Sequence, residues 1–316
     1  MTISSFLRRA FCAYVAAGVA VACSGCQASH ILPAQAPVAA LPQVQSVLPN
    51  NTLIYAVGDQ SSFIFKYPQG KLVHRLPATG LSACTDHAGS VFVTQVGSIA
   101  RYEHGGTKPA ETYKVAGSAY SCSISPKTHD LAAVVFCLKR CGEEVVVMGE
   151  QRRHRRHYHV ASLTSLLYCA YDDRGNLFVD GYNGSQFALA ELTSGATQFV
   201  GISLKSHIQY AAQIQWDGTY LAIETRVNPV IYRVSISGSD ARIVGRTVLD
   251  GVGTRASQSW IRDGTIAVPS ASYNKRPIEI FFWNYPAGGQ PTKIIKGFLG
   301  SGKHPMIDGV TLSVTN

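Results

Sequence analysis

One kind of turn recurs along this chain at an almost constant interval. The turns begin at Asn51, Gly89, His129, Gly175, Gly218 and Gly264, and a short apolar strand follows each of them. Successive turns are 38, 40, 46, 43 and 46 residues apart. A period of this length with a strand after every turn is typical of β-sheets repeated around an axis, where each repeat packs against its neighbours. The ladder of turns therefore predicts an all-β fold.

The repeat around Gly175 shows the expected unit of four antiparallel strands. Residues 166–171 form an apolar strand, the turn at 172–175 reverses the chain, and residues 176–180 return. Two further strands, 186–192 and 196–200, are expected to pair across a Thr-Ser-Gly turn. The same order recurs elsewhere, which predicts a six-bladed β-propeller of four-stranded antiparallel blades over residues 51–316. Seven blades, or a β-sandwich, are the alternatives.

The first repeat lacks an inner strand before residues 53–57, because the proline-containing segment 42–49 cannot supply one. Residues 305–314, at the other end of the chain, have the inner-strand pattern and no blade after them. We therefore expect the C-terminal strand to pair into the first blade. This closure would remove an exposed sheet edge.

Two phrases in the repeats, residues 169–181 and 215–222, resemble those of NHL-type and gluconolactonase-like six-bladed propellers. They also resemble a group of uncharacterised bacterial propeller lipoproteins. The resemblance is a repeat signature, so it implies the fold and carries no catalytic motif. A phosphate loop, a serine nucleophile elbow, a His-Glu-x-x-His motif and zinc-finger spacing do not occur in the sequence.

The first 26 residues have the pattern of a bacterial export signal. Arg8 and Arg9 precede an apolar run over residues 10–22, which at 13 residues is shorter than the roughly 20 of a membrane-spanning helix. Cys23 and Cys26 follow small residues, an arrangement that resembles a lipoprotein signal-peptidase site. We predict a lipoprotein-type signal peptide over 1–26 with Cys26 as the lipid attachment residue. Attachment at Cys23 and an ordinary secretory signal are the alternatives.

Residues 27–50 are rich in proline and alanine and contain no charged residue. Such a composition predicts a semi-extended tether. Together with the signal it predicts an exported, membrane-anchored lipoprotein of the outer membrane or the cell surface.

Removal of Arg8 and Arg9 with the signal lowers the formal net charge from +9 to +7. This modest excess fits an anionic envelope polymer or another envelope protein as partner, in addition to the membrane held through the lipid anchor. No specific nucleic-acid partner is predicted, and a monomer is expected.

In such a propeller, the turns after the second strands and the links between blades share one face around the axis, where sites usually form. We therefore select candidates on this axial face: Asp59, Tyr120, Asp180, Asn183, His207, Glu224, Arg255 and His304. Arg226, Asn228 and Tyr210 lie in the same turns and links.

The resemblance to gluconolactonase-like enzymes implies a divalent cation, such as calcium, held by Glu, Asn and Asp oxygens. Asp180, Asn183 and Glu224 are the weak match for such a site, because the family's metal-binding glutamate on the first blade corresponds to Asp59 at best. No cofactor is therefore predicted, and calcium or another divalent cation stays open.

Five cysteines lie in the repeat region. Cys137 and Cys141 share one short loop, which predicts a local disulfide in an exported protein, with a redox or metal pair as the alternative. Cys84, Cys122 and Cys169 occupy equivalent positions on three successive inner strands. We expect them to pack near the axis as buried thiols, with a metal-binding tripod as the alternative.

The run over residues 152–159 holds four arginines and three histidines. Its place in the repeat predicts the start of an outermost strand, where positive charge protects a sheet edge from pairing with another chain. Arg152, Arg153, Arg155 and Arg156 are alternatively an anion patch for envelope phosphates.

We expect a non-enzymatic binding or scaffold module of the cell envelope. The alternative is a metal-dependent hydrolase or lactonase of the gluconolactonase-like class, with its site on the axial face. The sequence leaves open whether the chain is an enzyme, and it favours a protein that is not one.

Overall fold

The computed structural model describes residues 48–137, 142–149, 154–227, 229–251, 258–270, 279–296 and 307–315. The chain divides into two units, Met1–Pro42 and Gln43–Asn316, and every described residue belongs to the second. The predictions that concern the signal peptide, most of the tether, and several single residues lie outside the described residues. These residues are Cys23, Cys26, Cys141, Arg152, Arg153, Asn228, Arg255 and His304.

All regular structure among the described residues is β-strand, as the ladder of turns predicts. Over this part of the chain, no helix combines the length and the apolar character needed to span a membrane.

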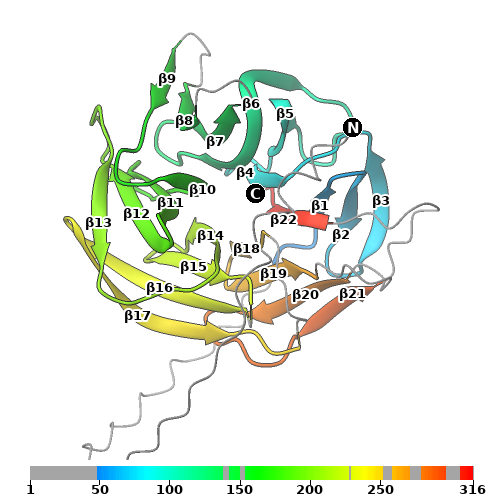
Figure 1. The fold of residues 1–316 in the computed structure, drawn as a ribbon. Helices are drawn as coiled ribbons and strands as arrows, with labels where there is room; N and C mark the ends of the chain where they lie inside the picture. The colour runs from blue at the N-terminus through cyan, green and yellow to red at the C-terminus, as the bar shows by residue number, and fades with distance from the viewer. Residues whose placement is uncertain are drawn as a thin grey trace, which may run out of the picture. The chain divides into compact units, whose positions relative to one another are not determined.

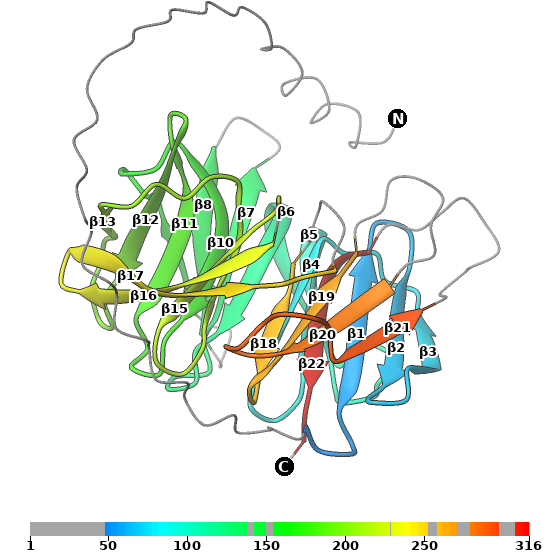
Figure 2. The same ribbon diagram turned by 90° about the horizontal axis from the view of Figure 1, so that it is seen from below.

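The first sheet joins the two ends of the described chain. Its strands, in spatial order, are β22 (Ile307–Ser313), β1 (Leu53–Gly58), β2 (Ser62–Lys66) and β3 (Lys71–Leu76). β1 and β22 pair antiparallel from Leu53 opposite Ser313 to Gly58 opposite Ile307. Figure 1 and Figure 2 both show red β22 beside blue β1. The predicted closure by the C-terminal strand is confirmed.

A second four-stranded sheet contains β18 (Trp260–Arg262), β19 (Thr265–Pro269), β20 (Glu279–Asn284) and β21 (Lys293–Lys296). All its pairings are antiparallel.

The largest sheet has eight strands and consists of two successive antiparallel meanders. One contains β10 (Ser165–Tyr171), β11 (Leu177–Asn183), β12 (Gln186–Leu192) and β13 (Val200–Leu204). The other contains β14 (Ala211–Trp216), β15 (Leu221–Thr225), β16 (Val230–Ser237) and β17 (Asp240–Val248). A short parallel pairing between β13 and β17, at Ser203 and Leu204, joins the two meanders at their outer edges.

The remaining sheet has six strands, which differs from the four expected in every repeat. They are β4 (Ser82–Thr85), β5 (Val91–Tyr102), β6 (Glu111–Ile124), β7 (Leu131–Cys137), β8 (Glu143–Met148) and β9 (Arg155–Tyr158). β6 pairs with β5 through its first half and with β7 through its second half, so one strand serves two repeats. Gly117 lies at this crossover, where a Cβ atom would overlap the carbonyl group of Phe136.

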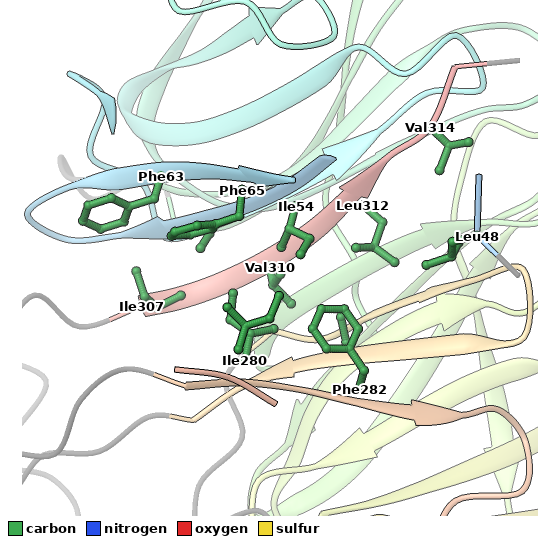
Figure 3. Close-up of a cluster of buried hydrophobic side chains, with 13 residues drawn as sticks. Leu48, Ile54, Phe63, Phe65, Ile280, Phe282, Ile307, Val310, Leu312 and Val314 are labelled. Carbon is green, nitrogen blue, oxygen red and sulfur yellow. The ribbon is translucent and has the colours of Figure 1, made fainter. Parts of the chain in front are cut away.

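The hydrophobic core lies between neighbouring sheets. Figure 3 shows one part of it, where Ile54 and Phe65 of the first sheet and Val310 of β22 pack against Ile280 and Phe282 of β20. Packing of this kind requires each sheet to be apolar on both faces, which explains the long runs of buried residues in the strands. Leu48, just before the first strand, is buried in the same cluster.

Candidate functional site on the axial face

The innermost strands of the sheets surround one centre (Figure 1). β22 contacts β4, β4 contacts β6, β6 contacts β10, and β10 contacts β14. Gln215 of β14 donates from Nε2 to the carbonyl oxygen of Ile261 in β18 (2.6 Å) and accepts from its N–H (2.8 Å). Gln258, before β18, makes the same pair of bonds with Ala83 of β4 (2.6 and 2.9 Å). Side-chain amides therefore join inner strands that share no sheet.

Four of these inner strands contain a β-bulge at corresponding positions of their repeats. The residues in the bulges are Asp308 in β22, Tyr120 in β6, Leu167 and Tyr168 in β10, and Ala212 and Gln213 in β14. A bulge turns side chains away from strict alternation, and such irregularities are over-represented beside functional sites. The recurrence explains how polar side chains from different repeats come together near the axis.

Two buried carboxyl groups lie opposite two of these bulges. Asp180 and Glu224 are the fourth residues of β11 and β15, and they are 0 % and 2 % exposed. Asp180 Oδ1 accepts a hydrogen bond from the backbone N–H of Tyr168 in the bulge (2.7 Å), while Oδ2 has no partner. Neither carboxyl oxygen of Glu224 has a partner of hydrogen-bonding geometry, although Ser259 lies near enough to lower its pKa. Burial raises the pKa of both residues to about 8.

A third carboxyl group, that of Asp308, lies in the bulge of β22. Burial raises its pKa to about 7, the neighbouring charge of Asp59 adds to this, and the backbone N–H of Asp59 opposes it. Oδ2 of Asp308 is buried without a hydrogen-bond partner. Near neutral pH, the three carboxyl groups are therefore protonated for a substantial part of the time.

Arg226, one residue beyond the end of β15, lies among these groups. Its Nη2 donates to the hydroxyl oxygen of Tyr120 (3.0 Å), which belongs to a strand two repeats away. The charge of Arg226 lowers the pKa of Asp180, Glu224 and Asp308 against the dominant effect of burial. Arg226 forms a hydrogen bond with a residue of β6, and its charge affects acidic groups of β11 and β22. Its side chain therefore lies close to the axis that these repeats share.

The Arg226 side chain is nevertheless reached by solvent, and the described residues form no salt bridge with it. The neighbouring Tyr168 raises the pKa of Arg226, so its guanidinium stays charged.

Tyrosine side chains surround the arginine. The rings of Tyr120 and Tyr168 lie 5.4 Å apart at an angle of 56°. Tyr182 lies near enough to Arg226 for the arginine to lower its pKa, which burial raises. Tyr210 is 59 % exposed, has a positive φ of 55°, and accepts the backbone N–H of Arg226 at its carbonyl oxygen (2.8 Å). Non-glycine residues in this conformation are uncommon and often belong to functional sites.

The structure thus brings together some of the predicted axial residues and leaves others apart. Asp180, Glu224 and Tyr120 join the cluster around Arg226, and Asp59 borders it through Asp308. Asn183 is exposed at the end of β11, and His207 is exposed in a link; no described contact brings either to the cluster.

Sequence reasoning missed Asp308, Tyr168 and Tyr182. All three lie inside strands, where only the bulges or the packing give them their place in the cluster. The one available signal was the acidic residue followed by glycine within the apolar segment 305–314.

The divalent-cation alternative finds no ligand set in the described part of the chain. No group of three or more His, Cys, Asp or Glu side chains there is arranged to hold a metal ion. Asp180 and Glu224 lie in the cluster, where the positive charge of Arg226 opposes cation binding.

The cysteine prediction needs a correction. Cys84 of β4 and Cys122 of β6 form a disulfide, so they are not the buried thiols that equivalent positions suggested, and a three-thiolate tripod is excluded. Their strands are neighbours around the axis, which brings the two sulfur atoms within bonding distance. Cys169 of β10 is a buried free thiol whose pKa burial raises to about 12. Cys137 is also disulfide-bonded, and its predicted partner Cys141 lies outside the described residues.

The described part of the basic run, residues 154–159, contains an outermost strand as predicted. β9 is the edge strand of the six-stranded sheet. Arg156 pairs with Asp130 (3.1 Å) and His157 with Glu144 (3.0 Å), whereas Arg155 is exposed. The edge position is confirmed, and part of its charge is used within the sheet.

No family model matches the sequence. A search of curated proteins finds no match to it either. Solved structures, in contrast, are similar in fold. A protein of unknown function from Bacteroides caccae is 11 % identical, with a TM-score of 0.61 over 83 % of this chain and 98 % of its own. A chain of a nidogen/laminin complex is 12 % identical, with a TM-score of 0.61 over 84 % and 99 %.

The β-propeller domain of Cps50 (Swd1) from Myceliophteria thermophila is 12 % identical, with a TM-score of 0.52 over 79 % of this chain and 85 % of that domain. At such identities the likeness concerns architecture alone. Together with the sheets arranged around one centre, it shows that this chain folds as a β-propeller.

Proposed function

We propose that this chain is a non-enzymatic binding module of the cell envelope, which recognises its ligand on the axial face of a six-bladed propeller related to the NHL-type and gluconolactonase-like group. The observation that carries the proposal is the cluster around Arg226, where a charged guanidinium lies beside buried carboxyl oxygens that have no hydrogen-bond partner. Buried polar groups without partners are costly, so their presence favours a site that an incoming ligand completes.

The assignment of six blades is based on the inner strands. β22, β4, the second half of β6, β10, β14 and β18 each occupy the same place in a repeat. The eight-stranded sheet then counts as two blades, and the six-stranded sheet as two blades that share β6. Four-stranded blades are the rule under this assignment, and the shared strand is the exception.

Export and lipid attachment fit this proposal. Disulfide bonds persist in oxidising compartments outside the cytoplasm, and the described residues include the Cys84–Cys122 bond and a bonded Cys137. The tether over residues 27–50 would then hold the propeller away from the membrane. Substitution Cys26→Ser is expected to abolish the incorporation of labelled fatty acid, and label that persists in this variant would move the attachment to Cys23.

The partner is proposed to be another envelope component that presents its ligand group to the axial face. The exposed Arg155 of β9 offers a weaker, peripheral contact for anionic envelope polymers. A metal-dependent hydrolase is not proposed, since no observation on the described residues favours it.

The experiment that tests the binding proposal compares two arginines on opposite faces. A library of small polar compounds is screened by thermal shift against the wild type, Arg226→Ala and Arg174→Ala. Arg174 is exposed in the turn between β10 and β11, at the end of the sheet opposite to Arg226. We expect stabilising compounds whose effect is lost in Arg226→Ala and retained in Arg174→Ala. Compounds that stabilise all three proteins equally would contradict an axial site.

A further inference from the structure

We propose that the axial cluster binds the carboxylate group of an organic acid, or of a peptide C-terminus, through the guanidinium of Arg226. This inference names the ligand class of the site and therefore rests on the proposed function.

The guanidinium group of Arg226 has N–H donors that a ligand can use. An arginine side chain has five N–H donors in a planar fork that matches the two oxygens of a carboxylate. The Nη2 atom donates one hydrogen bond to the Tyr120 hydroxyl, and the Tyr168 side chain lies near enough to accept another. Arg226 is exposed, so solvent reaches its side chain. A carboxylate that enters from the axial face can therefore form a bidentate pair without displacing a resident anion.

The charge state of the acidic groups around Arg226 favours an anionic ligand. The titratable groups around Arg226 come from five strands, the turn after β1 and the link before β14: Asp59, Tyr120, Tyr168, Cys169, Asp180, Tyr182, Tyr210, Glu224 and Asp308. Burial favours the neutral form of Asp180, Glu224 and Asp308, whereas the exposed Asp59 lies beyond Asp308. With Asp180, Glu224 and Asp308 protonated, Arg226 is the charged group at the centre, and a small anion neutralises it.

The carboxyl oxygens without hydrogen-bond partners favour a ligand that accepts hydrogen bonds. Oδ2 of Asp180, both carboxyl oxygens of Glu224, and Oδ2 of Asp308 are buried without partners. A protonated carboxyl group is a hydrogen-bond donor, and a carboxylate ligand is an acceptor alone. Binding of the anion would favour the protonated form of these acids further, so ligand binding is accompanied by proton uptake.

The tyrosine rings near Arg226 favour a ligand that carries an organic group. Tyr120, Tyr182 and Tyr210 present aromatic side chains around the arginine, and Tyr210 is largely exposed. Aromatic rings bind apolar or planar groups well while their hydroxyls stay in contact with water. An inorganic anion would leave these rings unused, and a metal cation would be repelled by Arg226.

Two matched pairs of probes test the proposal by isothermal titration calorimetry on the purified protein. Benzoate is compared with benzamide, and N-acetyl-Ala-Ala with a free C-terminus is compared with its amide. We expect one or both acids to bind and the neutral partners to bind at least about tenfold more weakly, because a hydrogen bond to a charged group contributes roughly 1.5–3 kcal/mol. Binding of benzoate alone identifies a free organic acid as the source, and binding of the peptide acid alone identifies a C-terminus.

Three variants locate the site. Arg226→Lys keeps the charge and loses the fork, so we expect a weaker complex; Arg226→Gln removes both and is expected to abolish binding; Arg174→Ala is expected to bind as the wild type. Circular dichroism and urea denaturation of each variant verify that it is folded. If Arg226→Gln does not fold, the comparison of Arg226→Lys with Arg174→Ala still tests the role of the fork.

The pH dependence gives an independent readout. Affinity for the acids is expected to fall as the pH rises from 6 to 9, and calorimetry in buffers of different ionisation enthalpy should detect net proton uptake near pH 8. Affinity that rises with pH would overturn the proposal, as would equal binding of benzoate and benzamide. Neutral compounds whose binding depends on Arg226 would overturn the ligand class while supporting the axial site. A complete lack of Arg226-dependent binding would overturn both.

Discussion

Arginine side chains occupy two contrasting regions of this propeller. On the edge strand β9, Arg156 has a carboxylate partner within its own sheet, although half of its side chain is exposed. Near the axis, Arg226 donates to the Tyr120 hydroxyl and lies beside carboxyl groups whose pKa burial raises to about 8. Part of the charge in the basic run is therefore paired with acidic side chains, whereas the described residues form no salt bridge with Arg226. The number of charges in a segment says less about binding than the partners that the fold supplies.

The largest expected effect concerns the covalent bond at the axis. Removal of the Cys84–Cys122 disulfide by the double change Cys84→Ala and Cys122→Ala should lower the free energy of unfolding by about 4 kcal/mol, since it closes a loop with a sequence separation of 38 residues. Urea denaturation measures the loss. Arg155→Ala on the edge serves as the control and should have no such effect. A loss below about 1 kcal/mol would contradict the view that the axial region depends on this bond.

A smaller loss is expected for the carboxyl group that holds the bulge of β10. Asp180→Ala leaves the buried N–H of Tyr168 without an acceptor, which should cost about 1–3 kcal/mol. Asp180→Asn retains an oxygen at the same place and should cost clearly less. Equal destabilisation of the two variants in urea denaturation would show that the charge of Asp180, rather than its acceptor oxygen, is what the fold requires.

The third prediction concerns pH. In the folded chain the pKa of Asp180 and of Glu224 is raised to about 8, whereas in the unfolded chain both titrate near 4. The folded state therefore binds more protons between these values, and the stability that each acid contributes is lost as the pH rises from about 4 to 8. Glu224→Gln should reduce this slope by up to about 1.4 kcal/mol per pH unit.

Urea midpoints at pH 5, 6.5 and 8 measure this slope. Glu144→Gln, which alters the partner of His157 on the edge sheet, is the matched control. An unchanged slope in Glu224→Gln would mean that this residue is ionised in the folded protein, and the axial cluster would then resemble the edge in its charge state.

The smallest effect is expected on the edge itself. Arg156→Ala removes an ion pair with Asp130 in which the arginine side chain is 54 % exposed, and pairs with such an exposed member contribute about 1 kcal/mol or less. Thermal unfolding at low and at high salt should show a small loss that salt reduces. A loss as large as that of Asp180→Ala would remove the distinction between the two regions.

The sequence predicted the repeated turns and the closing strand because their signals are local. Gly89, Gly175 and Gly218 all have positive φ angles in turns where Asp86, Asp172 and Asp217 accept backbone hydrogen bonds. The double use of β6 had no such signal, since a strand that continues between repeats contains no turn residue to mark the change.

The candidate site was predictable in part for the same reason. Glu224 and Arg226 lie at the end of the second strand β15, where a propeller places its axial face, and Asp180 lies in the middle of the second strand β11. Tyr168 and Asp308 belong to bulges, and a bulge depends on the pairing of two strands rather than on the pattern of one. The disulfide between Cys84 and Cys122 likewise depends on which inner strands are neighbours.

The pairing of β1 with β22 has a consequence for the order in which each molecule can fold during synthesis. Residues 53–58 complete their sheet only with residues 307–313, which are synthesised more than 240 residues later. During synthesis, the first strand must therefore wait with one edge unpaired until residues 307–313 have emerged. A chaperone that shields this edge would act at the start of the chain, and its release would coincide with the arrival of the last strand.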